Sequence, residues 1–112
     1  MPKTLNRPRS QYSRDALMLL GQLIREGRLS KALTTVDLAA RAGISRALLQ
    51  RIERGDPGCT IGAVFETAAI CGVQLFDEDE RPLAAHLARH SEKLALLPKA
   101  VRTSKKELKD DF

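Results

Sequence analysis

Apolar residues recur at helical spacing along most of this chain, and short polar segments separate the periodic stretches. Leu17, Leu20 and Ile24 share one such face, which predicts a helix that Ser13 caps and that continues through REGRLSKA. Gly27 weakens this helix by about 1 kcal/mol relative to alanine. The first predicted helix is therefore long and amphipathic, and Gly27 is its one weak point.

Two shorter helices are predicted next. Thr34 and Asp37 have the spacing of a capping box, in which each side chain bonds an unpaired amide of the first turn. Gly43 can adopt the left-handed conformation that ends such a helix. Ser45 then offers the next cap, and residues 46–54 form a third helix that GDPG stops.

The second half of the chain predicts two more helices. Thr60 opens one that Gly72 ends, and its apolar stripe comprises Ile61, Val64, Phe65, Ala68 and Cys71. RPLAAHLARHSEKLALL forms the last helix, with Pro82 in its first turn and Leu83, Leu87 and Leu94 on one side. VQLF, at 73–76, alternates like a short strand. Its alternatives are the start of another helix or a cover for the core.

Composition favours the same all-α fold class. The 112 residues suffice for one domain with tails, and with only three Phe, one Tyr and no Trp the core must be aliphatic, which suits packed helices. Cys59 and Cys71 form no CxxC pair, the N-terminus lacks the apolar segment of a signal peptide, and no apolar run is long enough to span a bilayer. We therefore expect a reduced, cytoplasmic protein with no membrane association.

Charge is unevenly distributed. The net charge is +5 and the pI is about 9.6, which indicates an anionic partner. Residues 1–14 carry four basic residues and no acidic one, and residues 30–58 carry five basic residues against three acidic ones, whereas residues 59–80 carry five acidic residues and no basic one. This distribution predicts a basic face for the anionic partner and an acidic segment, DEDE, directed away from it. DEDE is either a solvated loop or a contact for a basic protein.

DLAARAGISRALLQRIERG, at 37–55, has the pattern of a helix-turn-helix. Ala39 is the small residue at the crossing, Gly43 forms the corner, and the inward positions are Leu38, Ala42, Ile44, Leu49 and Ile52. The outward positions of the second helix are then Ser45, Arg46, Ala47, Gln50 and Arg51. Arginine can bind guanine, glutamine can pair with adenine and alanine can contact a thymine methyl group. Two ordinary packed helices with a soluble face are the alternative interpretation.

The stretch TTVDLAARAGISRALLQRIERGDPGCTIGAVFETAAICGVQLF resembles the Xre family of helix-turn-helix regulators, and within it the HipB-type antitoxins. The resemblance implies a lambda-repressor-like bundle of five to six helices, with VQLF as one short intersubunit strand. It also implies a homodimer that represses its own operon and binds a HipA-type kinase toxin. The DNA-binding positions that it implies are Thr35, Ser45, Arg46, Ala47, Gln50, Arg51 and Arg54. Leu48 departs from the family pattern, which often has a small hydroxyl residue there.

The predicted organisation is a flexible basic arm at 1–13, the Xre-type domain at 14–76, an acidic linker with the last helix at 77–97, and a flexible charged tail at 98–112. His86 and His90 have the i, i+4 spacing of metal ligands, but HLARH lacks the glutamate of HExxH and no third ligand is evident. We expect no metal, no cofactor and no enzyme activity. The alternatives to an antitoxin are a stand-alone repressor and a helix-turn-helix module that binds only protein.

Overall fold

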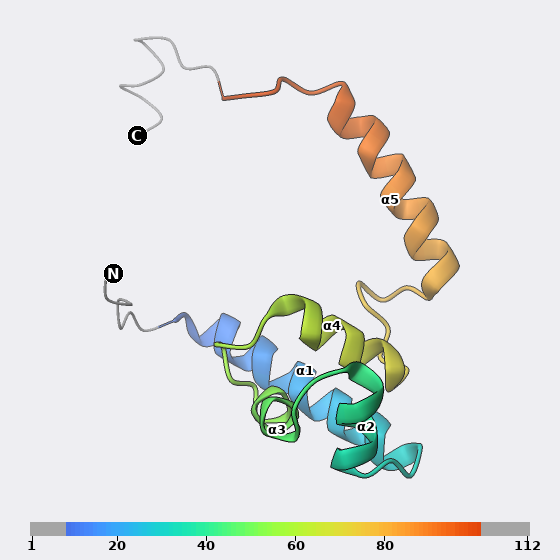
Figure 1. The fold of residues 1–112 in the computed structure, drawn as a ribbon. Helices are drawn as coiled ribbons and strands as arrows, with labels where there is room; N and C mark the ends of the chain where they lie inside the picture. The colour runs from blue at the N-terminus through green and yellow to red at the C-terminus, as the bar shows by residue number, and fades with distance from the viewer. Residues whose placement is uncertain (1–8, 102–112) are drawn as a thin grey trace. The chain divides into compact units, whose positions relative to one another are not determined.

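The computed structural model describes residues 9–101 and contains five helices there, which confirms the all-α prediction (Figure 1). They are α1 (Gln11–Ser30), α2 (Thr35–Ala42), α3 (Arg46–Glu53), α4 (Ile61–Ile70) and α5 (Glu80–Ala95). The chain divides into two compact units at Asp77 and Glu78, so that α1–α4 form the first unit and α5 belongs to the second. The predicted arm and tail lie mostly outside the described residues.

The first helix begins one turn earlier than the sequence predicted. Its cap is Ser10, whose Oγ accepts a hydrogen bond from the Ser13 amide at 3.1 Å. The prediction that Ser13 caps this helix was therefore wrong. The extra turn brings Gln11 into the helix, where its side chain donates to Asp15 Oδ1 at 2.8 Å and accepts from Arg14 at 2.9 Å. Such i, i+3 and i, i+4 contacts stabilise a first turn that a start after Ser13 would lose.

Helices α1 to α4 all end in the same hydrogen-bonded turn, the Schellman motif. At the end of α2, the Ile44 amide donates to the Ala39 carbonyl at 3.0 Å and the Gly43 amide donates to the Ala40 carbonyl at 3.2 Å. The left-handed residue in each motif is Ala32, Gly43, Gly55 or Gly72, with φ of 55°, 70°, 79° and 79°. Three of the four positions thus carry the residue that tolerates positive φ, and α1 alone ends on alanine.

The core of the first unit lies where α1, α2, α3 and α4 meet. Its buried apolar residues are Ile24, Leu38, Ala39, Leu49, Ile52, Ala68 and Cys71. Three of the predicted inward residues belong to this set, and Ala42 and Ile44 are partly buried. Leu48 also packs against the core. In contrast, Ile61 at the start of the α4 stripe is 69% exposed, so the apolar stripe of α4 is buried only toward its C-terminal end.

Glycines of α1 allow its backbone to approach two other helices closely. A Cβ at Gly21 would lie 2.6 Å from the Ile52 carbonyl oxygen, and one at Gly27 would lie 2.4 Å from the Cys71 carbonyl oxygen. Neither backbone oxygen can move without shifting its helix end. Gly27, which weakens the helix locally, is therefore required where α1 meets the end of α4.

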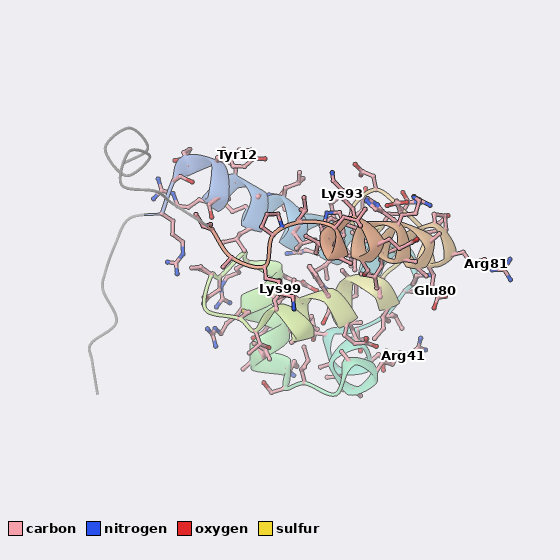
Figure 2. The ribbon with its side chains drawn as sticks, turned by 90° about the horizontal axis from the view of Figure 1, so that it is seen from above. Tyr12, Arg41, Glu80, Arg81, Lys93 and Lys99 are labelled. Carbon is pink, nitrogen blue, oxygen red and sulfur yellow. The ribbon has the colours of Figure 1, made fainter. Side chains whose placement is uncertain are left out.

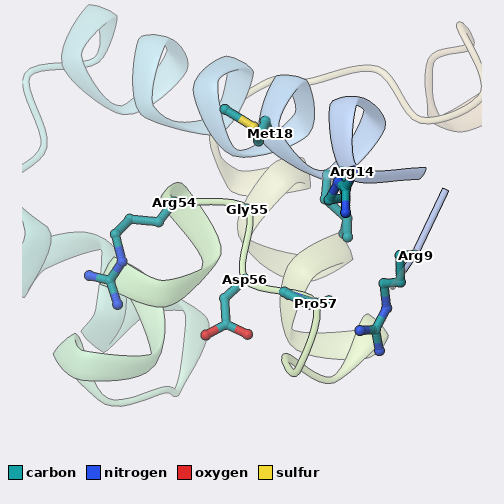
Figure 3. A pocket seen from close by; sticks show the side chains of 8 residues that line it. Arg9, Arg14, Met18, Arg54, Gly55, Asp56 and Pro57 are labelled. Atoms are coloured by element: carbon teal, nitrogen blue, oxygen red, sulfur yellow. The ribbon is translucent and has the colours of Figure 1, made fainter. Parts of the chain in front are cut away.

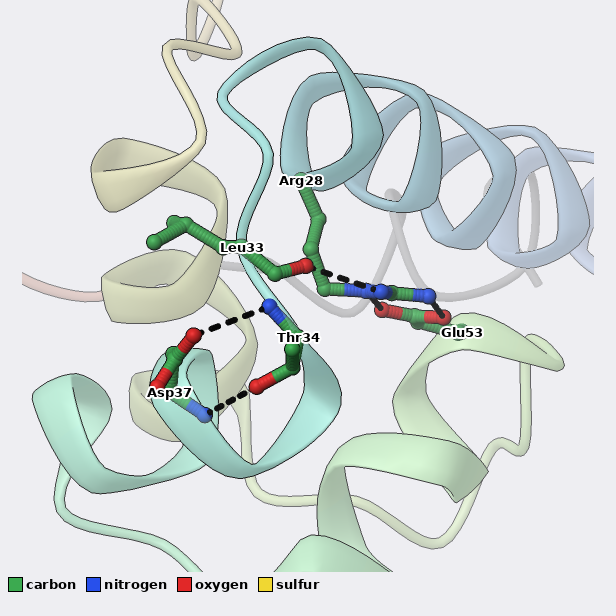
Figure 4. Close-up of polar contacts among 5 residues, drawn as sticks. All are labelled: Arg28, Leu33, Thr34, Asp37 and Glu53. Atoms are coloured by element: carbon green, nitrogen blue, oxygen red, sulfur yellow. Dashed lines mark hydrogen bonds and ion pairs between the residues drawn. The ribbon is translucent and has the colours of Figure 1, made fainter.

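A buried ion pair joins α1 to α3 (Figure 4). The Arg28 guanidinium donates to both carboxylate oxygens of Glu53, at 2.7 and 3.2 Å, and to the Leu33 carbonyl at 3.1 Å. Both side chains are about nine-tenths buried. The Glu53 carboxylate raises the pKa of Arg28, so the guanidinium stays charged inside the fold. The pair fixes the C-terminal end of α3 against α1.

The segment that follows α4 is not a strand within this chain. Phe76 and Asp77 both have positive φ, 57° and 58°, and form a tight turn that leads into the second unit. Phe76 packs edge-to-face on Phe65, with ring centroids 6.3 Å apart. The described residues form no strand, and pairing of VQLF with a second copy remains a prediction.

The second unit consists of α5 and the residues around it. α5 begins after Asp79, and none of its residues is buried. Figure 2 shows the Glu80, Arg81 and Lys93 side chains projecting from it. His86 Nδ1 lies 2.6 Å from Glu78 Oε2, and no group of three potential metal ligands occurs among residues 9–101. No helix in this described range is long and apolar enough to cross a membrane.

Candidate nucleic-acid interface

The corner between α2 and α3 is built from the local signals that the sequence predicted. The Thr34 hydroxyl accepts from the Asp37 amide at 3.0 Å, and the Asp37 carboxylate accepts from the Thr34 amide at 3.2 Å (Figure 4). The bond that the Thr34 amide donates to the carboxylate is the main reason that the pKa of Asp37 lies below its usual range, because it stabilises the charged form. Gly43 then reverses the chain, and Ser45 caps α3 by accepting from the Leu48 amide at 3.0 Å.

One face of α3 is fixed in the core and the other is exposed. Leu49 and Ile52 are buried, whereas Arg46, Ala47 and Gln50 are exposed. Gln50 is three positions after Ala47 and four after Arg46, so its side chain lies beside both on the helix surface. The predicted base-reading side chains therefore share one accessible surface, which we call the reading face.

The first residue of α3 is unusual for a helix start. The N-terminus of a helix carries partial positive charge, which favours acidic side chains there. α3 has no acidic residue in its first turn and begins with Arg46. Helix stability does not explain a cation at this position. A negatively charged ligand at the helix start would.

Ser45 remains able to contact such a ligand. Its hydroxyl oxygen accepts the capping bond from Leu48, so the hydroxyl proton is left for another acceptor. A phosphate oxygen beside the α3 N-terminus would meet this hydroxyl as well as the helix dipole.

The remaining predicted residues have more restricted positions. Arg51 is held by Asp56, with Nε 3.0 Å from Oδ2, and its side chain is 41% exposed. The pKa of Asp56 is lowered by this bond and by the Gly58 amide. Arg54 is exposed at the end of α3, and Thr35 is partly buried at the first position of α2. The structure thus leaves Ser45, Arg46, Ala47 and Gln50 exposed at and after the start of α3, whereas Thr35 and Arg51 are partly buried and Arg54 lies at the end of the helix.

Sequence reasoning missed two features of this region. The Arg28–Glu53 pair that supports α3 joins residues 25 positions apart, and no local pattern indicates it. From the sequence, Arg9 and Arg14 count only among the basic residues of positions 1–14. They line a surface hollow together with Arg54. Only the folded chain brings them to the end of α3.

Comparison with known proteins agrees with this geometry. The helix-turn-helix domain family matches residues 19–84, which include most of α1, all of α2 to α4 and the start of α5. No curated protein matches the chain. The match covers more than half of the sequence and includes the whole α2–α3 corner. The chain belongs to the helix-turn-helix domain family, of the Xre and lambda-repressor type, whose members are DNA-binding regulators.

Proposed function

We propose that this chain is a sequence-specific transcriptional repressor that binds operator DNA as a homodimer. The observation that carries the proposal is the reading face of α3, where Arg46, Ala47 and Gln50 are exposed while the opposite face is held in the core. An α-helix fits the major groove of B-DNA, and this side-chain set offers contacts to guanine, thymine and adenine. Repression follows if the occupied operator overlaps the promoter.

Phosphate contacts complete the proposed interface. Ser45 and the start of α3 suit one phosphate, and Thr35 at the start of α2 suits another. Arg54 offers a cation at the far end of α3. Arg51 contributes mainly by holding Asp56 and the loop after α3, since its guanidinium is already paired.

The apolar stripe of α5 supports the homodimer. Within α5, Leu83, Leu87, His90 and Leu94 follow one another at spacings of four, three and four residues, with His90 as the one polar member. This is the heptad spacing of a helix that pairs with another helix. Leu87 is 67% exposed and Leu94 is 55% exposed in the single chain. A symmetric dimer that reads two half-sites about 34 Å apart, one turn of the duplex, would need one α3 helix from each copy.

The test of DNA reading selects duplexes from a randomised library with the full chain and then compares variants on the selected sequence. Arg46→Ala should weaken binding by about 1–3 kcal/mol and relax the preference at one base pair. Arg25→Ala is the matched control, since Arg25 is an exposed arginine of α1 outside the reading face. The expected pattern is a loss of affinity in Arg46→Ala without a loss of thermal stability. Full affinity and unchanged preference in Arg46→Ala would refute the assignment.

A toxin-neutralising role extends this proposal. The acidic residues Asp77, Glu78, Asp79 and Glu80 precede α5, and all but Glu78 are exposed. They suit a basic surface on a HipA-type kinase, in keeping with the sequence resemblance. Co-expression with a kinase encoded beside this chain should relieve growth arrest, and neutralising these acids should weaken the rescue. The absence of such a neighbour would favour a stand-alone repressor.

A further inference from the structure

A hollow lies on the first unit between the start of α1 and the loop that follows α3 (Figure 3). It measures about 610 Å³ and is open to solvent. Its lining comprises Arg9, Arg14, Leu17, Met18, Arg54, Gly55, Asp56 and Pro57. We call it the arginine hollow, because its three cations come from two separate elements of the chain.

The single carboxylate in the arginine hollow is already occupied. Asp56 accepts from Arg51 Nε at 3.0 Å and from the Gly58 amide at 2.7 Å. Arg9, Arg14 and Arg54 form no ion pair with any carboxylate in the part of the chain that the structure describes. Arg14 bonds only the neutral side chain of Gln11. Asp56 also interacts electrostatically with Arg54, but one carboxylate cannot balance three arginines, so the hollow has a net positive charge that an anion would neutralise.

The helix at the edge of the hollow adds to this charge. α1 begins there with Ser10 as its cap, and its first turn contains no acidic residue. The positive end of a 20-residue helix thus lies beside Arg9 and Arg14. Like α3, α1 places basic residues where helix stability favours acidic ones.

Close backbone packing fixes the two sides of the hollow relative to each other. Gly55 has φ of 79°, and a Cβ there would lie 2.9 Å from both the amide nitrogen and the Cα of Met18. The loop after α3 is therefore held directly against α1. Arg54 directly precedes this glycine, so the backbone of Arg54 is also held close to α1, which carries Arg14.

We propose that the arginine hollow binds a backbone phosphate of the duplex that α3 reads. This phosphate lies outside the base pairs that α3 contacts, and the inference rests on the proposed function. The ligand chemistry is a phosphate monoanion, for which arginine is the preferred partner. Arg54 follows the eight residues of α3 and therefore lies about 12 Å along the helix axis from its start. The hollow thus extends the binding surface past the reading face toward flanking DNA.

The experiment uses the full chain and the duplex selected from the randomised library. Single phosphates in the flanks are replaced by neutral methylphosphonate linkages, and affinity is measured for wild type, Arg14→Ala and Arg9→Ala. Neutralising one or two of the flanking linkages should lower the affinity of wild type several-fold. Arg14→Ala should bind the duplexes with these neutral linkages as tightly as it binds the unmodified duplex. The slope of log K against log salt should fall by about 1 in Arg14→Ala. Arg25→Ala should respond as wild type does.

The outcomes separate this inference from the proposed function. A wild-type chain that binds the selected duplex but tolerates every neutral flanking linkage would overturn the inference alone. Another outcome is that wild type tolerates the neutral linkages while millimolar inorganic phosphate shifts the side-chain NMR resonances of Arg9 and Arg14. In that case the hollow binds free phosphate, and its assignment to a DNA phosphate is wrong. A chain with no sequence preference would overturn the proposed function as well.

Discussion

The first four helices and α5 are both amphipathic, yet only the first four bury their apolar faces within this chain. α1 to α4 contribute the seven buried apolar residues of the core, and glycines bring their backbones into direct contact. α5 has 16 residues and buries none of them. Periodicity in the sequence therefore identifies the helix without identifying what covers it. Among the described residues, α1 to α4 have a core of their own, whereas nothing covers the apolar stripe of α5.

The largest expected contrast comes from matched leucine substitutions in the two regions. Leu49→Ala removes a fully buried side chain and should lower the free energy of unfolding by about 2–5 kcal/mol. Leu87→Ala should change it by less than about 0.5 kcal/mol in dilute protein, because the side chain is mostly exposed. Urea unfolding followed by circular dichroism measures both. A large loss in dilute Leu87→Ala would mean that α5 is covered within the single chain.

Breaking the buried ion pair should have the next largest effect. Glu53→Ala leaves the Arg28 guanidinium buried without its carboxylate, which should destabilise the first unit by about 3 kcal/mol. The double variant Arg28→Met, Glu53→Ala should lose less than the sum of the single variants. Additive losses in this double-mutant cycle would show that the two side chains do not act as a pair.

The four Schellman motifs allow a finer comparison within the first unit. Gly43→Ala should destabilise it by about 1 kcal/mol through positive φ alone, because no atom lies within 4 Å of the added Cβ. Ala32→Gly should instead stabilise it by about 0.5–1 kcal/mol, since Ala32 already has φ of 55°. Thermal unfolding of both variants measures the difference. The melting temperature should fall in Gly43→Ala and rise in Ala32→Gly. A change of the same sign in both variants would contradict the prediction.

The smallest expected effect concerns the capping box. The native pKa of Asp37 is lowered, so its stabilising contribution is complete above about pH 4 and is lost as the pH falls through the native pKa. Asp37→Asn keeps the acceptor oxygen but cannot titrate. Its stability should therefore depend less on pH in this acidic range. An identical pH profile for wild type and Asp37→Asn would contradict the role of the carboxylate.

Local signals explain which parts of the fold were predictable. Thr34, Asp37, Gly43 and Ser45 act within a few residues of their own positions, and the structure confirms each of them. The start of α1 was misplaced because two serines three residues apart, Ser10 and Ser13, are equally good caps by type. Side-chain contacts of Gln11 favour the earlier one, and these are visible only once the extra turn exists.

Contacts between distant residues explain the rest. Gly27 was interpreted as a weak point of the helix, but its reason is the carbonyl of Cys71, 44 positions away. The Arg28–Glu53 pair and the arginine hollow likewise depend on how α1 lies against the end of α3. In the candidate site, the exposure of Arg46 and Gln50 followed from helical spacing. The pairing of Arg51 with Asp56 did not, because it depends on the loop conformation after α3.

The way in which α3 is anchored has a consequence for the evolution of this protein. Leu49, Ile52 and Glu53 hold the helix, and none of them belongs to the reading face. Positions 46, 47 and 50 can therefore mutate with little cost to folding. Under the proposed function, duplicated genes would diverge toward new operators by substitutions at these three positions, and an engineer would exchange them between paralogues without redesigning the core.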